Sequence, residues 1–315
     1  MLLQLLRRTA VFAASLAVAS VVVFAFMSVL PGDPARVALG VNATEEAVAA
    51  TRAAFGTDRP LVVQYLDWVS GLPVGDFGRS YVTNVDIGPQ IVDRLLVTTW
   101  LVLSGMAVAL VVALPLGVLA AVRHRRASGA VISAASQVGV AVPSFIAGIL
   151  LVTVFAVRLR WLPSGGWTPP AADPVDFLRK LLLPALALGL VQGAVLTRYV
   201  RSAVLDVLRE DYLRTARSKG LTPGRALVRH GLRNAAIPVV TVLGLQLSTL
   251  LVGAVVVERV FVIPGLGSLL LDGVANRDLL LVQGVVIVLV LAVLVVNFLV
   301  DVAYTVLDPR LRRAA

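Results

Sequence analysis

Six long stretches without a charged side chain dominate the pattern of hydrophobic and polar positions. They cover residues 9–32, 97–122, 127–157, 181–197, 234–257 and 279–300. An α-helix needs about 17 to 25 mostly apolar residues to cross the hydrocarbon core of a bilayer, and each stretch reaches that range. The pattern therefore predicts an all-α polytopic membrane protein with six transmembrane helices, at about 10–30, 97–122, 130–157, 181–200, 235–257 and 279–304.

These helices divide the chain into two regions. Residues 1–96 hold the first helix and a long following segment, and residues 97–315 hold the other five helices. In the long segment, Thr44 precedes Glu45 and Glu46, as at the start of a helix. A later amphipathic stretch offers four side chains to a membrane surface: Leu61, Tyr65, Leu66 and Trp68. We expect this segment to form either a small extracytoplasmic cap over the outer opening of the membrane helices or an interfacial linker. The pattern does not distinguish the two.

Basic residues indicate the orientation of the spans, because Lys and Arg concentrate in cytoplasmic segments. With the N-terminus inside, the inner segments carry 17 of the 28 basic residues and 5 of the 18 acidic ones. Those basic residues include Arg310, Arg312 and Arg313 near the C-terminus. We expect both termini to be cytoplasmic. We also expect the first stretch to remain as a span, since it is longer than the apolar core of a secretory signal and lacks a cleavage pattern.

Composition agrees with a membrane protein and excludes several other classes. Hydrophobic residues make up 58% of the chain and charged residues 15%, against about 25% charged in soluble domains. The absence of cysteine excludes disulfides, thiolate metal sites and thiol catalysis. The formal net charge of +10 is explained by insertion topology and anionic lipid. No basic patch interleaved with aromatic residues appears, so we expect no nucleic-acid partner.

The sequence contains no recognisable catalytic motif. A phosphate-binding loop needs Gly-Lys followed by Ser or Thr, but the two lysines are followed by Leu181 and Gly220. The two histidines, His124 and His230, lie far apart among arginines, which argues against a histidine metal site. No nucleophile elbow is present either. We therefore expect no enzyme activity and no cofactor bound by this chain, so energy for transport has to come from a partner.

Few polar side chains interrupt the apolar stretches. Gln192 and Gln246 are candidates for lining a transport pathway, because polar groups inside a membrane face a bundle interior or a cavity. The alternative is a role in packing through hydrogen bonds between helices. No series of buried acids suggests a proton relay, which counts against an ion-coupled carrier. Four prolines fall within or at the ends of the stretches: Pro115, Pro143, Pro184 and Pro238.

The segment at 201–234 is basic and patterned as two helices between two spans. Acidic residues precede Arg214, Arg217 and Lys219, an order that suits the dipole of a helix at about 210–219. Gly220 predicts a helix stop, and Thr222 with Pro223 predicts the cap and first position of a second helix, about 226–234. The segment predicts a helix–turn–helix elbow on which a soluble partner docks. The alternative is an ordinary positively charged inner loop.

The same segment carries a resemblance to a known family. Residues 211–221 read DYLRTARSKGL and 229–234 read RHGLRN, with Ile237 and Pro238 following. This resembles the EAA loop of ABC-importer permeases, closest to the B-type permease of dipeptide and oligopeptide importers. Arg214, Thr215 and Ala216 occupy the Glu-Ala-Ala triplet, so the usual glutamate is absent. Further segments resemble the same subfamily: 31–35, 75–80, 143–145, 162–166 and 258–278.

The resemblance implies a type I ABC importer permease (MetI-like) fold. It implies a homologous C-type permease, two ABC ATPase subunits that bind ATP and Mg, an external substrate-binding protein and a peptide substrate. The EAA elbow would couple to an ATPase through Asp211, Arg214, Thr215, Ala216, Arg217, Lys219, Gly220, Leu221, Arg229 and Arg233. Ala216 and Gly220 would permit close approach, while Arg214, Arg217 and Lys219 would meet the ATPase surface.

Other functions remain open from the sequence. The same subfamily includes permeases for nickel chelates, glutathione and other small solutes. An autonomous channel or secondary carrier would be favoured by an inverted repeat, which we do not find. A membrane enzyme is disfavoured by the missing catalytic groups.

Overall fold

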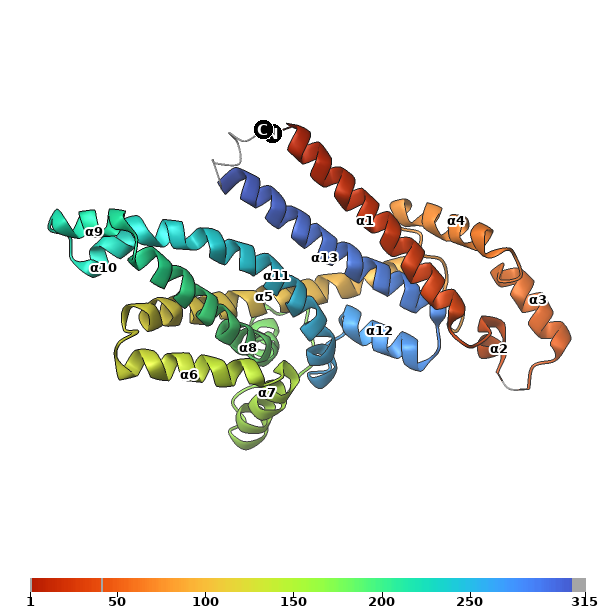
Figure 1. The fold of residues 1–315 in the computed structure, drawn as a ribbon. Coiled ribbons are helices and arrows are strands. Elements are labelled where there is room, and N and C mark those ends of the chain that lie inside the picture. The colour runs from red at the N-terminus through yellow and green to blue at the C-terminus, as the bar shows by residue number, and fades with distance from the viewer. Residues whose placement is uncertain (1, 41, 308–315) are drawn as a thin grey trace. The chain divides into compact units, whose positions relative to one another are not determined.

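A computed structural model of the chain describes residues 2–40 and 42–307 (Figure 1). Within these ranges the structure is helical, and its only β feature is an isolated bridge between Arg79 and Asp86. The C-terminal arginines used above for orientation, Arg310, Arg312 and Arg313, lie outside the described residues. So does Asp308.

Within the described residues, five helices are long and apolar enough to cross a membrane. They are α1 (Leu2–Val29), α5 (Ile87–Val122), α8 (Pro174–Leu208), α11 (Leu232–Val260) and α13 (Leu279–Leu307). α5 begins ten residues before the predicted span at 97–122, and α8 extends beyond 181–200 at both ends. Helices longer than the hydrocarbon thickness tilt or continue into the interfaces. Pro115, Pro184 and Pro238 lie inside continuous helices.

The span predicted at 130–157 is broken. α6 (Ala127–Ala141) and the pair formed by α7 (Ser144–Leu151) with a π-helical segment (Val152–Arg158) are bent by 99° relative to each other. Pro143 explains the break, because proline has no N–H and disfavours the helical conformation of the residue before it. Val142 is accordingly extended, with φ −86° and ψ 119°. Counting this bent pair as one span brings the candidate spans to six.

The chain forms two compact units, which we describe separately. The core unit comprises Thr99–Ile263 and the segment that begins at Val296, and the loop unit comprises Leu2–Thr98 and Pro264–Val295. Short helices belong to both: in the loop unit α2 (Pro34–Leu39), α3 (Glu45–Phe55), α4 (Leu61–Gly71) and α12 (Leu266–Ala275); in the core unit α9 (Asp211–Ser218) and α10 (Pro223–Ala226).

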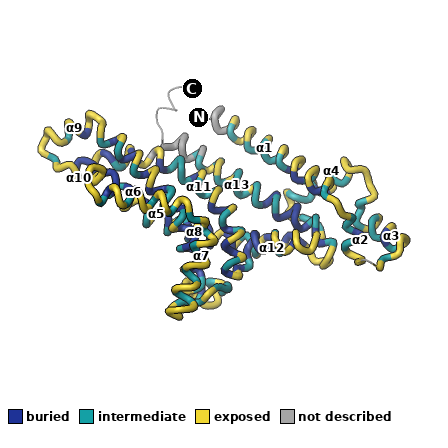
Figure 2. Tube along the Cα trace, turned by 60° about the horizontal axis from the view of Figure 1, so that its bottom comes forward, coloured by how far each residue is buried: buried dark blue, intermediate teal, exposed yellow. Residues whose placement is uncertain are grey.

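In the core unit, α8 packs against α6, α7 and α11. Buried positions recur along α8, whereas α9 is mostly exposed (Figure 2). Small residues let α5 approach α8 closely: a Cβ on Gly189 would lie 2.5 Å from the Cβ of Val108, and one on Gly117 would lie 2.6 Å from the Cβ of Val200. Such close packing contacts drive helix association in a bilayer. The hydrophobic effect does not, because lipid tails are as apolar as the side chains of the helices.

In the loop unit, α4 packs on α1 through its aromatic side chains. The Tyr65 hydroxyl shares a 2.9 Å hydrogen bond with that of Ser20, and the rings of Phe24 and Trp68 lie 6.1 Å apart. Tyr65 and Trp68 are therefore turned toward protein and not toward the membrane face predicted for them. Leu61 and Leu66 remain exposed, as that prediction requires.

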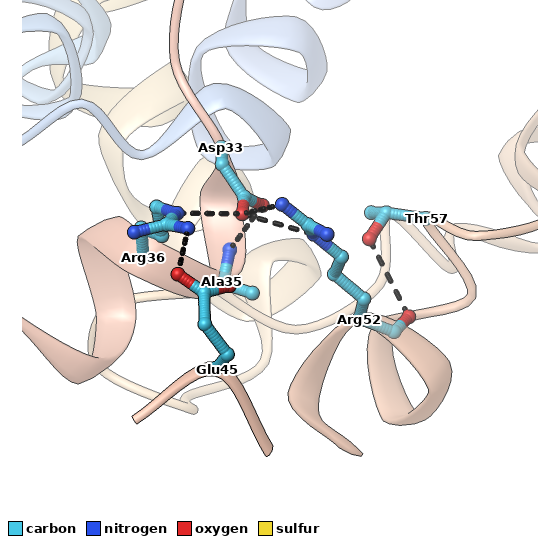
Figure 3. A network of polar contacts seen from close by, with 6 residues as sticks. All are labelled: Asp33, Ala35, Arg36, Glu45, Arg52 and Thr57. Atoms are coloured by element: carbon cyan, nitrogen blue, oxygen red, sulfur yellow. Dashed lines mark hydrogen bonds and ion pairs between the residues drawn. The ribbon is translucent and has the colours of Figure 1, made fainter. Parts of the chain in front are cut away.

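A network of charges fixes the hairpin of α2 and α3 (Figure 3). The Asp33 carboxylate accepts hydrogen bonds from the amide of Ala35, at 3.1 Å, and from Arg52 Nε, at 3.0 Å. Arg36 forms a further ion pair with Glu45. Thr44 caps α3 by accepting a hydrogen bond from the amide of Ala47, at the position where the sequence predicts a helix start.

Candidate functional site

The basic segment at 201–234 forms an elbow between α8 and α11. α9 ends at Ser218, and Gly220 follows with φ +91°, a left-handed conformation that glycine adopts without a steric penalty. Pro223 occupies the first turn of α10, as predicted, but the Thr222 side chain makes no capping hydrogen bond. The helix predicted at 226–234 is instead composed of three elements: the end of α10, a π-helical segment (Leu227–Gly231) and the start of α11.

The inner side of the elbow is apolar and packs on the ends of the spans. Leu213, Ala226 and Leu227 are buried in one cluster with Val204 and Val207 of α8. Because these side chains come from α8, α9, α10 and the π-helical segment, they join the elbow to the membrane helices. The elbow and the adjoining ends of the membrane helices thus share one packed apolar cluster.

Gly231 lies against this cluster. A Cβ there would lie 2.7 Å from Leu227 Cδ1 and 3.1 Å from Val207 Cγ1, so a larger residue would require the ends of these side chains to shift. At the surface of the elbow, Asn234 Nδ2 donates a 2.9 Å hydrogen bond to the Tyr212 hydroxyl and so ties α9 to α11. Tyr212 and Asn234 lie in the two motif segments quoted from the sequence, but their contact was not predicted, because positions 22 residues apart leave no local pattern.

The outer side of the elbow is exposed and basic. Eight of the ten residues predicted to couple to a partner are exposed: Asp211, Arg214, Thr215, Arg217, Lys219, Gly220, Arg229 and Arg233. Ala216 and Leu221 are only partly exposed and pack against the apolar cluster instead. Arg214 lies 3.8 Å from Asp211, and both side chains are so exposed that this ion pair adds little stability. The guanidinium groups thus remain available to an acidic surface.

Backbone contacts hold some of these side chains in place. Arg217 Nε donates a 3.3 Å hydrogen bond to the carbonyl of Leu213, and the Thr215 hydroxyl donates one of 3.0 Å to the carbonyl of Asp211. Gly220 has no atom within 4 Å of the position that a Cβ would occupy. The turn after α9 is therefore open, and another surface could approach its backbone closely.

The two glutamines proposed for a pathway contact each other. Gln192 on α8 donates a hydrogen bond from Nε2 to Oε1 of Gln246 on α11. Gln192 is buried and Gln246 is partly exposed. This geometry suits the packing alternative, in which two amides satisfy each other between membrane helices. A role in lining a pathway remains a prediction.

The residues described by the structure contain no group of three or more His, Cys, Asp or Glu side chains placed to hold a metal ion. What the elbow presents is a cationic outer side on an apolar base, an arrangement suited to recognition of another surface.

Comparison with known proteins covers both regions of the chain. The family described as "Binding-protein-dependent transport system inner membrane component" matches residues 113–313, and "Binding-prot-dependent transport system membrane comp, N-term" matches residues 1–102. The chain is 39% identical over 312 residues to the glutathione transport system permease protein GsiC of Salmonella choleraesuis (strain SC-B67), covering 99% of both chains. It is 39% identical over 298 residues to GsiC of Escherichia coli (strain K12), covering 95% of both.

Among solved structures, a MetNI methionine ABC transporter in inward-facing conformations resembles this chain with a TM-score of 0.57 and 19% identity. The match covers 69% of this chain and 96% of that one. At this level of identity the likeness concerns the fold alone, and it confirms the predicted all-α, MetI-like importer permease fold.

Proposed function

The chain belongs to the family of inner membrane components of binding-protein-dependent transport systems, and we propose that it forms half of the pathway of an ATP-driven importer of short peptides. Membership makes it a multi-pass permease subunit of an ABC importer, without an ATPase site of its own. Such a permease works with a partner permease, an ATPase and a binding protein. The proposal adds the identity of these partners, the substrate and the route of coupling.

We place the ATPase at the elbow. The observation that carries this assignment is the two-sided character of the elbow, with exposed cationic residues over an apolar cluster shared with α8. In the proposed cycle, two ATPase subunits bind ATP and Mg, and closure of their dimer moves α9. The apolar cluster then transmits the movement to the membrane helices. A homologous C-type permease would supply the second half of the pathway and a second elbow.

The orientation follows from the same assignment. An elbow that meets an ATPase lies in the cytoplasm, which agrees with the concentration of Lys and Arg in alternate segments. Both termini would then be cytoplasmic, and 31–96 would face the external binding protein. We propose that this region receives the loaded binding protein.

The substrate class is a short peptide, and glutathione is the specific candidate that the comparisons favour. The 39% identical relatives are glutathione permeases by name, and glutathione is itself a tripeptide derivative. Substrate choice in such systems depends largely on the external binding protein, so both the peptide and the glutathione assignments require a transport measurement.

Reconstitution tests the proposal. The chain is assembled in proteoliposomes with the second permease, the ATPases and the binding protein of its own transport system, and uptake of labelled tri-alanine and glutathione is measured. We expect ATP-dependent uptake of at least one of them, lost when this chain or the ATPases are omitted. Uptake that proceeds unchanged without the ATPases would refute energy coupling, and uptake of neither compound would refute the peptide assignment.

A further inference from the structure

One side of α4 is apolar and exposed. Val62 and Leu66 lie one helical turn apart and are 70% and 55% exposed, and Leu61 and Val63 beside them are also exposed. Proteins that stay in water rarely expose a contiguous apolar patch, and where one occurs it marks contact with a membrane or another protein. The transport function proposed above gives this side of α4 no role.

Contacts with α1 set the level of α4 along that helix. The Tyr65 hydroxyl meets that of Ser20 at 2.9 Å, and the centroid of the Phe24 ring lies 5.4 Å from that of Tyr65 and 6.1 Å from that of Trp68. Ser20 lies nine residues before the end of α1 at Val29, which is about 13 Å along a helix that rises about 1.5 Å per residue. One leaflet contributes about 15 Å of hydrocarbon. α4 thus packs beside the part of α1 that crosses one leaflet (Figure 1).

The length of α1 leaves little room for another placement. Its candidate span, Leu6–Val29, has 24 residues and is about 36 Å long, about 6 Å more than the hydrocarbon core. An excess of that size leaves Ser20 within the hydrocarbon even where the end of the helix projects. Val18, Val22 and Phe26, on both sides of Ser20 along α1, are more than half exposed, as suits positions that acyl chains cover. The exposed side of α4 lies at the same level, so it continues a lipid-facing surface.

The polar side chains of α4 lie on another side of the helix. Gln64 and Asp67 line a cavity of about 310 Å³ within the loop unit, whereas Val62 and Leu66 do not. Asp67 Oδ2 lies 3.1 Å from Arg59 Nη1, so the helix brings no uncompensated charge into the membrane. Charged side chains at membrane depth face a cavity or pair with each other in this way. This two-sided pattern is that of an amphipathic helix at a membrane interface.

We propose that α4 is embedded in one leaflet of the membrane, where the acyl chains of phospholipids cover its exposed apolar side. In the orientation proposed above, this is the external leaflet. α4 then anchors the segment between α1 and α5 to the bilayer, while the charged hairpin of α2 and α3 stays in water. The inference concerns membrane contact and not ATP coupling or substrate, so its failure and the failure of the transport proposal are distinguishable.

Site-directed spin labelling tests the proposal on the full chain, reconstituted in vesicles of phosphatidylcholine and phosphatidylglycerol. The chain has no cysteine, so each introduced cysteine carries the only nitroxide. Val62→Cys and Leu66→Cys report on the exposed side of α4. Val18→Cys on α1 is the reference for lipid, and Ala50→Cys on the exposed side of α3 is the reference for water. Because all four positions are exposed, we expect none of the substitutions to unfold the chain.

Collision rates with two relaxing agents separate lipid, water and protein as the surroundings of each label. Oxygen concentrates in the hydrocarbon, whereas a neutral nickel chelate stays in water. We expect the ratio of oxygen to nickel collisions at Val62 and Leu66 to approach the ratio at Val18. It should exceed the ratio at Ala50 by several-fold.

Two results would overturn the proposal. Nickel collisions at Val62 and Leu66 as frequent as those at Ala50 would place this side of α4 in water. Few collisions with either agent would show that protein covers it, as a partner permease or a second copy of the chain would. Each of the two α4 labels tests the proposal alone, so the test stands even if one variant fails to insert.

Discussion

Ser80 donates a buried hydrogen bond to the carboxylate of Asp278, a residue 198 positions further along the chain. The same carboxylate accepts from the amides of Tyr81 and Leu281, both at 3.4 Å. The Ser80 hydroxyl in turn accepts from the amide of Thr83 at 2.9 Å. Asp278 thus joins the loop before α5 to the start of α13, and so holds together two sequence-distant parts of the loop unit.

We predict that Asp278→Ala destabilises the loop unit, because it leaves the buried hydroxyl and amides without their acceptor. The loss should be about 1–3 kcal/mol in the free energy of unfolding. Thermal unfolding and limited proteolysis of the purified chain would measure it. Asp58→Ala, at an exposed position, is the control and should change little. Equal behaviour of the two variants would show that the Asp278 contacts do not stabilise the unit.

Gly220→Glu should abolish ATP-dependent uptake while the protein still inserts into the membrane. The charged side chain would project from the open turn after α9 into the proposed ATPase contact. Because φ at Gly220 is +91°, any side chain also strains the backbone, so the control needs the same strain elsewhere. Gly75→Glu provides it, with φ +79° and no atom within 4 Å of its Cβ position. Normal uptake by Gly220→Glu would count heavily against the elbow.

Tyr212→Phe should lower the number of substrate molecules transported per ATP by several-fold. The substitution removes the hydroxyl that accepts from Asn234 and so loosens the link between α9 and α11. The cost in stability should be only about 0.5–1.5 kcal/mol, because one exposed hydrogen bond is lost. Parallel measurement of uptake and ATP hydrolysis gives the ratio. An unchanged ratio would show that this link does not transmit movement.

We predict that replacing Gln192 or Gln246 by leucine alters transport more than assembly. Each single variant leaves one amide without its partner, whereas the double leucine variant removes both. A double-mutant cycle on thermal stability, with uptake measured in parallel, separates the two roles. Restored stability with lost uptake in the double variant would support a pathway role. Losses of stability and uptake that match in every variant would assign the pair to packing.

The α2–α3 hairpin should loosen in acid. Burial raises the pKa of Asp33, but the hydrogen bonds from Arg52 and the Ala35 amide and the nearby charges of Arg52 and Arg36 outweigh it, so the pKa is lowered. The network therefore contributes its full stability above the ordinary aspartate pKa of about 3.9 and loses it as pH falls through the lowered value. Hydrogen exchange of the Ala35 amide at pH 6 and below measures this. Asp33→Asn should remove the pH dependence, and persistence of the dependence would contradict the assignment.

The apolar stretches predicted most of the membrane helices because a bilayer admits few structures besides apolar helices of set length. The stop at Gly220 and the start at Pro223 were also visible, since both depend on local backbone geometry. The bend at Pro143 was harder to predict from the sequence. Pro115, Pro184 and Pro238 also lie within or at the ends of apolar stretches, but their helices remain continuous.

Contacts between distant residues could not be predicted. Nothing in the local pattern pairs Ser80 with Asp278 or Gln192 with Gln246. The amphipathic stretch at 61–69 suggested that Trp68 faces the membrane, because periodicity identifies an apolar face but not what covers it. α1 covers that face in the structure.

Cross-linking tests the central claim, that an ATPase docks on the elbow, most directly. The chain has no cysteine, so a single introduced thiol gives an unambiguous site. In the assembled complex, Ser218→Cys on the exposed side of α9 should cross-link to an ATPase subunit carrying its own introduced cysteine, with a yield that changes on ATP binding. Ser70→Cys, exposed in the loop unit, should give no such product. Absence of an ATPase adduct at position 218, with adducts formed elsewhere on the chain, would contradict the account.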